Sequence, residues 1–141
     1  MLKIHNDLQR SIYKMRNFME FQHTSTIGDT PIYENCSISS VLDEVSQLFQ
    51  SEIDEKQLKV KIDVPEDAEF QVDKQSMEQV FFNLLENAVE ASTTNGTIIV
   101  TSKEVCRKKS NLLVIMIRDY GAKFSKDAID SYLNYEKLRP L

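Results

Sequence analysis

The sequence lacks several features that would point to a common functional class. Cys36 and Cys106 are its only two cysteines, and their separation fits no metal-binding or redox motif. We expect two unpaired, buried thiols and not a disulfide, because free cysteine usually packs as a small hydrophobic residue. No apolar run approaches the roughly 20 residues that span a bilayer. The N-terminus also has no uninterrupted apolar core of the signal-peptide kind, so we predict a cytoplasmic chain without a membrane segment.

The sequence also has no excess of basic residues. Lysine and arginine together number 17 against 22 acidic residues, which gives a formal net charge of −5. A protein that binds a nucleic acid duplex normally carries a basic stripe. The densest basic stretch here runs from Arg107 to Lys109 between two strand-like segments, and it is interpreted as a solvated hairpin loop. The sequence therefore predicts no nucleic acid partner.

What the chain does contain is enough residues for one domain and an additional helix. It has 141 residues, of which 41% are hydrophobic and 28% charged, as is ordinary for a globular domain. Residues 1–24 are expected to form a long helix, because an apolar stripe from Leu8 to Met19 recurs at steps of four and three. Such a helix needs a partner, either in this domain or in a second copy. Gly28 and Pro31 then interrupt any periodicity, which predicts a linker over 27–38 that includes a short strand from about residue 33.

Alternating helical and strand patterns fill the rest of the chain. Ser39 or Ser40 is expected to cap a helix that continues to about residue 53. Strict alternation over 58–64 predicts a half-buried strand, with a short partner strand at 70–72. Further along, we expect a helix capped by Asp73 that runs to about Ser92, an Asn-Gly turn, a strand over 97–105, a central strand over 112–117 that is covered on both sides, and a weakly helical tail over 125–138. This order predicts an α+β fold.

Two asparagines on the helix that follows Asp73 are candidate ligand-binding residues. Asn83 and Asn87 lie four residues apart and therefore stack on one side of the helix. They are placed at the edge of an apolar face, where a half-desolvated amide needs hydrogen-bond partners. A carboxamide oxygen also suits Mg²⁺. The alternative is that both amides bond only to water or to a neighbouring loop. The expected apolar face consists of Met77, Val80, Phe81, Leu84, Leu85 and Ala88.

A second candidate element follows the apolar run 112–117. Asp119 is expected at the end of a strand, where ligand pockets tend to form. A half-buried carboxylate there accepts a hydrogen bond from an exocyclic amine, and Gly121 lets the backbone pass close to a flat ligand. The alternative is an ordinary glycine turn after a strand.

Taken together, these two elements resemble the histidine-kinase branch of the Bergerat-fold ATPases. The run Asn83 to Ala91 (NLLENAVEA) resembles the N box of that family, and Arg118 to Gly121 (RDYG) resembles the start of its first glycine box. The resemblance implies a two-layer α/β sandwich, with helices on one face of a mixed or antiparallel sheet. It also implies that ATP and Mg²⁺ bind, and that the helix over residues 1–24 belongs to a dimerisation hairpin.

The resemblance assigns a role to each candidate residue. Asn87 would hold Mg²⁺ on the phosphates, Asn83 would lie beside the phosphates, Asp119 would read the adenine amine, and Gly121 would pack near the base. Relatives that hydrolyse ATP have a glutamate at the position of Asn83, and asparagine cannot serve as a general base at neutral pH. The resemblance therefore implies phosphotransfer to a histidine, with a response regulator or another kinase domain as partner.

Several residues depart from the family pattern. Lys123 stands where the family has its second glycine, and Glu90 stands where many members have a lysine near the phosphates. The later glycine-rich box that closes a lid on the phosphates is not found before Leu141. His5 lacks the acidic residue and proline that follow the phosphoacceptor of the family. It also lies on the apolar stripe, which favours a helix-interface histidine.

These observations predict three segments and leave three functions open. The segments are a dimerisation-type helix (1–26), a linker (27–38) and an ATP-binding domain (39–141) that is truncated after the first glycine box. The first function is a shortened histidine kinase that forms a homodimer through residues 1–24 and does not autophosphorylate alone. The second is a degenerate, non-catalytic relative that binds a response regulator or a partner kinase. The third is a helical dimerisation protein that only resembles the family.

Overall fold

The computed structural model describes residues 2–22, 30–121, 125–127 and 129–131, with the side chains of 17–22 left out. Most of the helical tail predicted at 125–138 lies outside these residues. Within this part of the chain, no helix is both long and apolar enough to cross a membrane. Nine elements follow one another: α1 (Leu2–Gln22), β1 (Tyr33–Ser37), α2 (Ile38–Gln47), α3 (Gln50–Glu55), β2 (Lys59–Asp63), β3 (Glu69–Asp73), α4 (Lys74–Ala91), β4 (Thr97–Arg107) and β5 (Ser110–Asp119).

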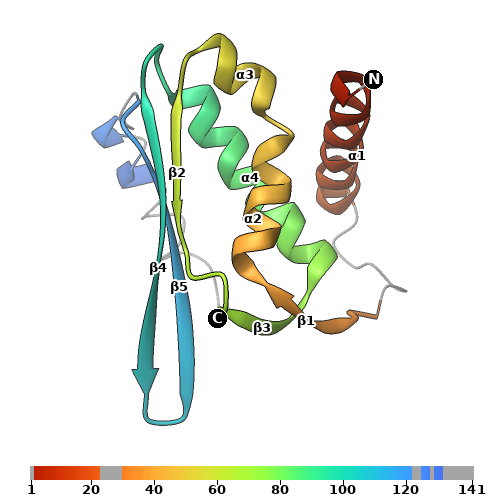
Figure 1. The fold of residues 1–141 in the computed structure, drawn as a ribbon, viewed down its shortest axis with the longest axis vertical. Helices are drawn as coiled ribbons and strands as arrows, with labels where there is room; N and C mark the ends of the chain where they lie inside the picture. The colour runs from red at the N-terminus through yellow and green to blue at the C-terminus, as the bar shows by residue number, and fades with distance from the viewer. Residues whose placement is uncertain (1, 23–29, 122–124, 128, 132–141) are drawn as a thin grey trace.

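The main sheet has three strands in the order β2-β4-β5. β2 runs parallel to β4, and β4 runs antiparallel to β5. Helices α2 and α4 cover one face of this sheet (Figure 1). The structure thus confirms the predicted α+β fold with a mixed sheet and helices on one face. Parallel pairing of β2 and β4 is possible because α4 lies between them in the chain and supplies the crossover that parallel neighbours require.

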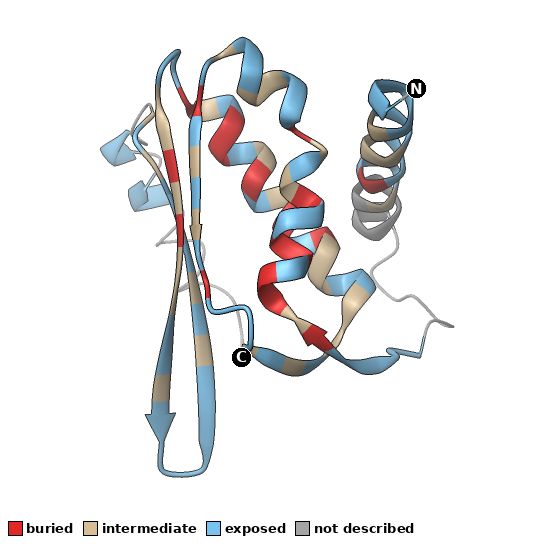
Figure 2. Cartoon of the chain, viewed as in Figure 1, coloured by how far each residue is buried: buried red, intermediate tan, exposed pale blue. Residues whose placement is uncertain are grey.

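The core lies between this sheet and the helices (Figure 2). Ile98 and Val100 point from β4 toward the helices and are fully buried. Phe49 and Phe82 meet them from the helical layer, with ring centroids 5.2 Å apart. Burial of large apolar side chains of this kind stabilises a fold by about 1.5–3 kcal/mol each. The packing of Phe82 against Phe49 helps to fix how α4 is rotated about its own axis.

The position of β5 differs from the sequence prediction. The apolar run 112–117 was expected in a central strand that is covered on both sides, but β5 lies at the edge of the described sheet. Its side chains alternate, so that Leu112, Val114 and Met116 are exposed by 40%, 39% and 48%. The cause is that α2 and α4 cover one face of the sheet only. A continuous apolar run does not distinguish this arrangement from a strand that is buried on both faces.

Strand β3 also pairs differently from the prediction. It was expected to partner the strand over 58–64, but it pairs antiparallel with β1 in a separate two-stranded sheet. Ile38 N–H donates to Ala68 C=O (3.1 Å), which ties the end of β1 to the turn before β3. The short strand expected from about residue 33 is β1, whereas α2 begins at Ile38, within the stretch 27–38 that was predicted as a linker.

Three local details correct the sequence prediction further. The helix expected from residue 39 to 53 is two helices, α2 and α3, which meet at Leu48 and Phe49. Its N-cap is Ser37, whose side-chain oxygen accepts from Ser40 N–H (3.3 Å), and not Ser39 or Ser40. Cys36 is buried as predicted, whereas Cys106 is exposed because it lies in the part of β4 that extends beyond β2.

Candidate functional site

Helix α4 carries both candidate asparagines, but it is rotated relative to the prediction. Val80 and Leu84 were expected on the buried face, yet they are exposed by 49% and 46%. Phe82 and Val89 are buried in their place, because the ring of Phe82 packs between Phe49 and Tyr13. Asn83 is consequently half-buried and Asn87 is exposed.

The C-terminal end of α4 is fixed by a single lysine. Lys56 Nζ donates to the carbonyl oxygens of Val89 (2.8 Å) and Ser92 (3.1 Å), and it lies 3.3 Å from that of Glu90. A cation at this position satisfies terminal carbonyl groups and interacts favourably with the helix dipole. Asn95 follows with φ of 62°, as the predicted Asn-Gly turn requires. The last turn of α4 is therefore held in one place.

The end of β5 packs directly against this last turn. A Cβ placed on Gly121 would lie 1.9 Å from the carbonyl oxygen of Ala91, so only glycine permits the observed approach. Asp119 is half-buried at the strand end, and its Oδ1 accepts a hydrogen bond from Gly121 N–H (2.9 Å). A carboxylate has further acceptor positions, so Asp119 retains the capacity to accept from a ligand.

The close contact of Gly121 with Ala91 brings the two predicted motifs together. Asn87 lies one helical turn before Ala91, and Asp119 lies two residues before Gly121. An exposed amide and a half-buried carboxylate therefore lie on adjacent elements, one on α4 and one at the end of β5. Within the described residues, no group of three histidine, cysteine, aspartate or glutamate side chains is placed to hold a metal ion. Asn87 would supply one oxygen ligand, which fits Mg²⁺ that takes its other ligands from phosphates and water.

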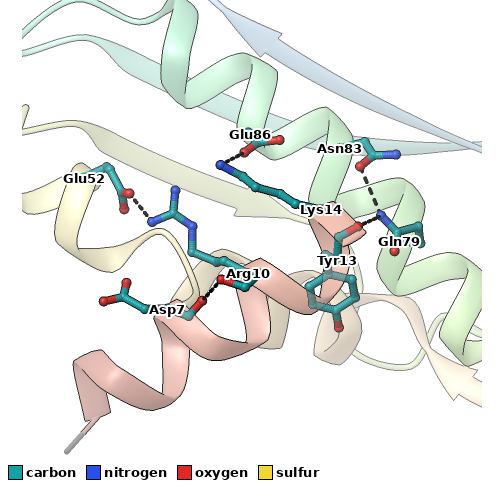
Figure 3. A network of polar contacts seen from close by, with 9 residues as sticks. Asp7, Arg10, Tyr13, Lys14, Glu52, Gln79, Asn83 and Glu86 are labelled. Carbon is teal, nitrogen blue, oxygen red and sulfur yellow. Dashed lines mark hydrogen bonds and ion pairs between the residues drawn. The ribbon is translucent and has the colours of Figure 1, made fainter. Parts of the chain in front are cut away.

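Asn83 has a different environment from Asn87. Its Oδ1 accepts a hydrogen bond from Gln79 Nε2 (3.2 Å), and Gln79 Nε2 also donates to the backbone carbonyl of Tyr13 on α1 (3.3 Å) (Figure 3). Sequence reasoning did not single out Gln79, which is only 6% exposed. The available signal was its spacing, since Gln79, Asn83 and Asn87 recur at four-residue steps on one side of the helix.

Helix α1 reaches this region through a polar face. Arg10 forms an ion pair with Glu52, and Lys14 pairs with Glu86 at 3.2 Å. The ring of Tyr13 stacks on Phe82 with centroids 4.8 Å apart. The opposite face, which carries Leu8 and Met15, is exposed. Residues of α1 thus lie beside the first of the two asparagines.

The remaining residues of interest lie apart from this region. His5 is exposed on α1, and Glu90 is exposed near the end of α4. Lys123 falls outside the described residues. Two open hollows surround Asp73 at the opposite, N-terminal end of α4, so neither adjoins Asn87 or Asp119.

Comparison with known proteins gives one similar sequence and a consistent structural match. No family model matches the sequence. The chain is 24% identical over 95 residues to the "Non-motile and phage-resistance protein" of Caulobacter vibrioides, a span of 67% of this chain and 11% of that protein.

Similar solved structures include histidine kinases and their catalytic domains. The catalytic domain of ThkA matches with a TM-score of 0.60 at 24% identity over 68% of this chain and 63% of that domain. ThkA in complex with the response regulator TrrA matches at 0.64 and 22% identity (88% and 35% covered). Full-length ShkA in complex with AMPPNP matches at 0.64 and 17% identity (86% and 26% covered).

The chain has the fold of a histidine-kinase catalytic domain. It spans less than two thirds of the ThkA catalytic domain and about a tenth of the Caulobacter protein. The kinase-like fold agrees with the family that the N-box and glycine-box residues predict, and it places those residues on the elements where the prediction put them, α4 and the end of β5.

Proposed function

We propose that this chain is the ATP-binding domain of a histidine kinase and binds Mg²⁺-ATP between the end of β5 and α4. The observation that carries the proposal is the approach of Gly121 to Ala91, which sets Asp119 beside the turn of α4 that follows Asn87. A ligand with an amine at one end and phosphates at the other would match this arrangement. The Asp119 carboxylate would accept from the amine, and the amides of Asn83 and Asn87 would lie on the side of the phosphates. The similarity to ShkA, whose structure holds AMPPNP, supports this choice of ligand.

Each residue has a role that its environment permits. Asp119, half-buried and held by Gly121 N–H, would accept from the adenine amine. Asn87, exposed on α4, would give its amide oxygen to Mg²⁺. Asn83 would contact the phosphates. When bound, ATP supplies the phosphoryl group, and the Mg²⁺ neutralises charge on its phosphates.

The reaction that fits this site is phosphoryl transfer and not hydrolysis. An amide at position 83 cannot remove a proton from water at neutral pH, so the site has no general base there. We propose a histidine as phosphoacceptor and a response regulator as partner, the latter supported by the similarity to ThkA in complex with TrrA. His5 is a candidate acceptor, and its exposure on α1 is the observation that supports it. Cytoplasmic location and the absence of autophosphorylation by this chain alone remain predictions.

Equilibrium titration with a non-hydrolysable ATP analogue tests the nucleotide site. We expect Mg²⁺-dependent binding that Asn87→Ala weakens at least tenfold, since a bound Mg²⁺ would lose its protein ligand. Gln75→Ala, at another exposed position of α4, is the matched control and should bind as the wild-type chain does. No binding at millimolar analogue would contradict the proposal.

We further propose that the chain forms a homodimer through α1. Its outward face carries Ile4, Leu8, Ile12 and Met15, which are exposed by 73%, 60%, 37% and 63%. Its inward face makes the polar contacts with α3 and α4 already described. A helix with an unpaired apolar stripe at four- and three-residue steps is typical of a helical dimer interface.

Sedimentation of a stripe variant tests this dimer. Leu8→Glu places a charge in the apolar stripe and should convert the dimer into a monomer without unfolding the domain. Lys3→Glu alters an exposed residue off the stripe and should leave the dimer intact. A wild-type chain that sediments as a monomer at every concentration would refute the interface.

The second candidate function is a non-catalytic module that keeps the fold to bind a response regulator or a partner kinase. Glu90 favours it, because this exposed carboxylate on α4 would repel phosphates where many members have a lysine. Lys123 in the first glycine box favours it as well. Absence of analogue binding, together with complex formation with a receiver domain, would establish this function in place of the first.

A further inference from the structure

Gln79 joins the backbone of α1 to the candidate nucleotide site. Its side chain is buried between α1 and α4, and its amide nitrogen carries two hydrogens. One points to the carbonyl oxygen of Tyr13 (3.3 Å), and the other points to Oδ1 of Asn83 (3.2 Å). Both donors of the Gln79 amide are therefore used in one relay that runs from α1 to Asn83 (Figure 3).

The carbonyl group of Tyr13 determines which atoms of the Gln79 and Asn83 amides face each other. A backbone carbonyl only accepts hydrogen bonds, so the atom of Gln79 that faces it must be the nitrogen. Because that nitrogen is also the atom that faces Asn83, the facing atom of Asn83 must be its oxygen. The NH₂ group of Asn83 is consequently turned away from Gln79, as Figure 3 shows.

This orientation determines what Asn83 can bind. An NH₂ group donates hydrogen bonds and therefore suits a phosphate oxygen, whereas it cannot coordinate a metal ion. Asn83 and Asn87 are thus chemically distinct although their side chains are identical. The first presents a donor, and the second is exposed and unconstrained by Gln79, so that its oxygen can face Mg²⁺.

We propose that the docking of α1, transmitted through Gln79, sets the amide of Asn83 in the orientation that binds phosphate. The proposal rests on the function proposed above and adds a regulatory link to the same site. Gln79 is a positioning residue, because it would act through Asn83 and not on the nucleotide itself. The position of α1 and the affinity for ATP would then be coupled, and coupling of binding free energies is reciprocal.

The contacts that hold α1 make this link reversible. Two of them are ion pairs at least partly open to solvent, Arg10 with Glu52 and Lys14 with Glu86. Among the described side chains of α1, Tyr13 stacks on Phe82 and is the one that belongs to the buried core. When α1 leaves this surface, Gln79 loses the carbonyl acceptor that fixes its amide, and its hold on Oδ1 of Asn83 is weakened.

Substitutions at Gln79 in the full chain test the relay. Glutamate at position 79 has one O–H donor when protonated and none when ionised, so it cannot donate to both Tyr13 and Asn83. We expect Gln79→Glu to weaken binding of a Mg²⁺-ATP analogue at least tenfold, while the affinity for adenosine, which has no phosphates, stays unchanged. Gln79→Met removes both donors at similar volume and should weaken analogue binding a few-fold. Gln75→Glu adds the same charge at an exposed position of α4 and should change neither affinity.

Hydrogen exchange of α1 distinguishes the proposed coupling from a purely structural role of Gln79. A saturating Mg²⁺-ATP analogue should raise the protection of backbone amides in α1 of the wild-type chain, and this gain should be absent in both Gln79 variants. The relay is refuted if Gln79→Glu binds the analogue like wild type, or if analogue and adenosine affinities fall together. A wild-type chain that binds neither ligand would refute the proposed function and the relay with it. Wild-type binding with an unaffected Gln79→Glu would refute the relay alone.

Discussion

At the scale of single residues, the position of the end of β5 against α4 depends on one glycine, Gly121. The sequence suggested that Gly121 lets the backbone pass close to a flat ligand. In the structure, Gly121 passes close to the protein itself, at the carbonyl group of Ala91. This contact decides where the end of β5 lies relative to α4, and hence how far Asp119 lies from Asn87.

Replacement of Gly121 by alanine should therefore disturb both stability and the site. The added Cβ would lie 1.9 Å from the Ala91 carbonyl oxygen, so the strand end or the helix must move. We expect Gly121→Ala to lower the free energy of unfolding by about 1–3 kcal/mol, as overpacking typically does. Urea denaturation measures this change. Thr94→Ala, in the exposed turn after α4, should change it by less than about 0.5 kcal/mol. Equal stabilities of the wild type and Gly121→Ala would show that the contact is not tight.

At the scale of elements, α1 has two faces with different chemistry. Among the described side chains, the part of the apolar stripe up to Met15 is turned outward, and Arg10 and Lys14 form ion pairs with the domain. Periodicity alone identified the apolar face but not the polar one, because charged and aromatic residues at helical spacing are also typical of a solvated surface. Among the described side chains of α1, Tyr13 is the one that belongs to the buried core.

The docking of α1 should weaken at strongly alkaline pH. Burial, reinforced by Glu78, whose carboxylate accepts from Tyr13 Oη (3.3 Å), raises the pKa of Tyr13 to about 12. The unfolded chain releases this proton near pH 10, so the free energy of unfolding should fall as the pH rises from about 10 to about 12. Urea denaturation of the wild type and of Tyr13→Phe across this range isolates the effect from the lysines that also titrate there. If the free energies of unfolding of the two chains fall in parallel with pH, the effect does not come from Tyr13.

At the scale of the whole molecule, the two cysteines report on different parts of the fold. Cys36 lies in β1 within the core, and burial followed by the nearby Glu34 carboxylate raises its pKa. Cys106 is exposed near the tip of the β4–β5 hairpin. Since the thiolate is the reactive form, both burial and pKa protect Cys36.

Thiol labelling should therefore show one fast and one slow cysteine. Cys106 should react at the rate of an exposed thiol, and Cys36 should react only when the domain unfolds. In Cys106→Ser the fast phase should disappear, and the urea midpoint of Cys36 labelling should coincide with that of helix loss by circular dichroism. Fast labelling of Cys36 in the native chain would show that β1 and β3 open independently of the core.

The elements that the sequence predicted well are those with strong local signals. The alternation over 58–64, the Asn-Gly turn at Asn95 and the spacing of Asn83 and Asn87 each follow from backbone geometry or side-chain periodicity. Three features were predicted wrongly: the partner strand of β3, the position of β5 in the sheet, and the burial of Val80 and Leu84. Each of these depends on contacts between distant segments, which no local pattern contains.

The sequence by itself determined the α+β class, the helix with two asparagines at one spacing, and the aspartate and glycine at the end of an apolar strand. These follow from side-chain periodicity and turn chemistry within a few neighbouring residues. Only the tertiary structure decided that Gly121 lies against Ala91, that α1 turns its polar face inward, and that Gln79 holds the oxygen of Asn83. The physical reason is that packing of Phe82 against Phe49 and Tyr13 sets the rotation of α4, and this rotation determines which side chains meet.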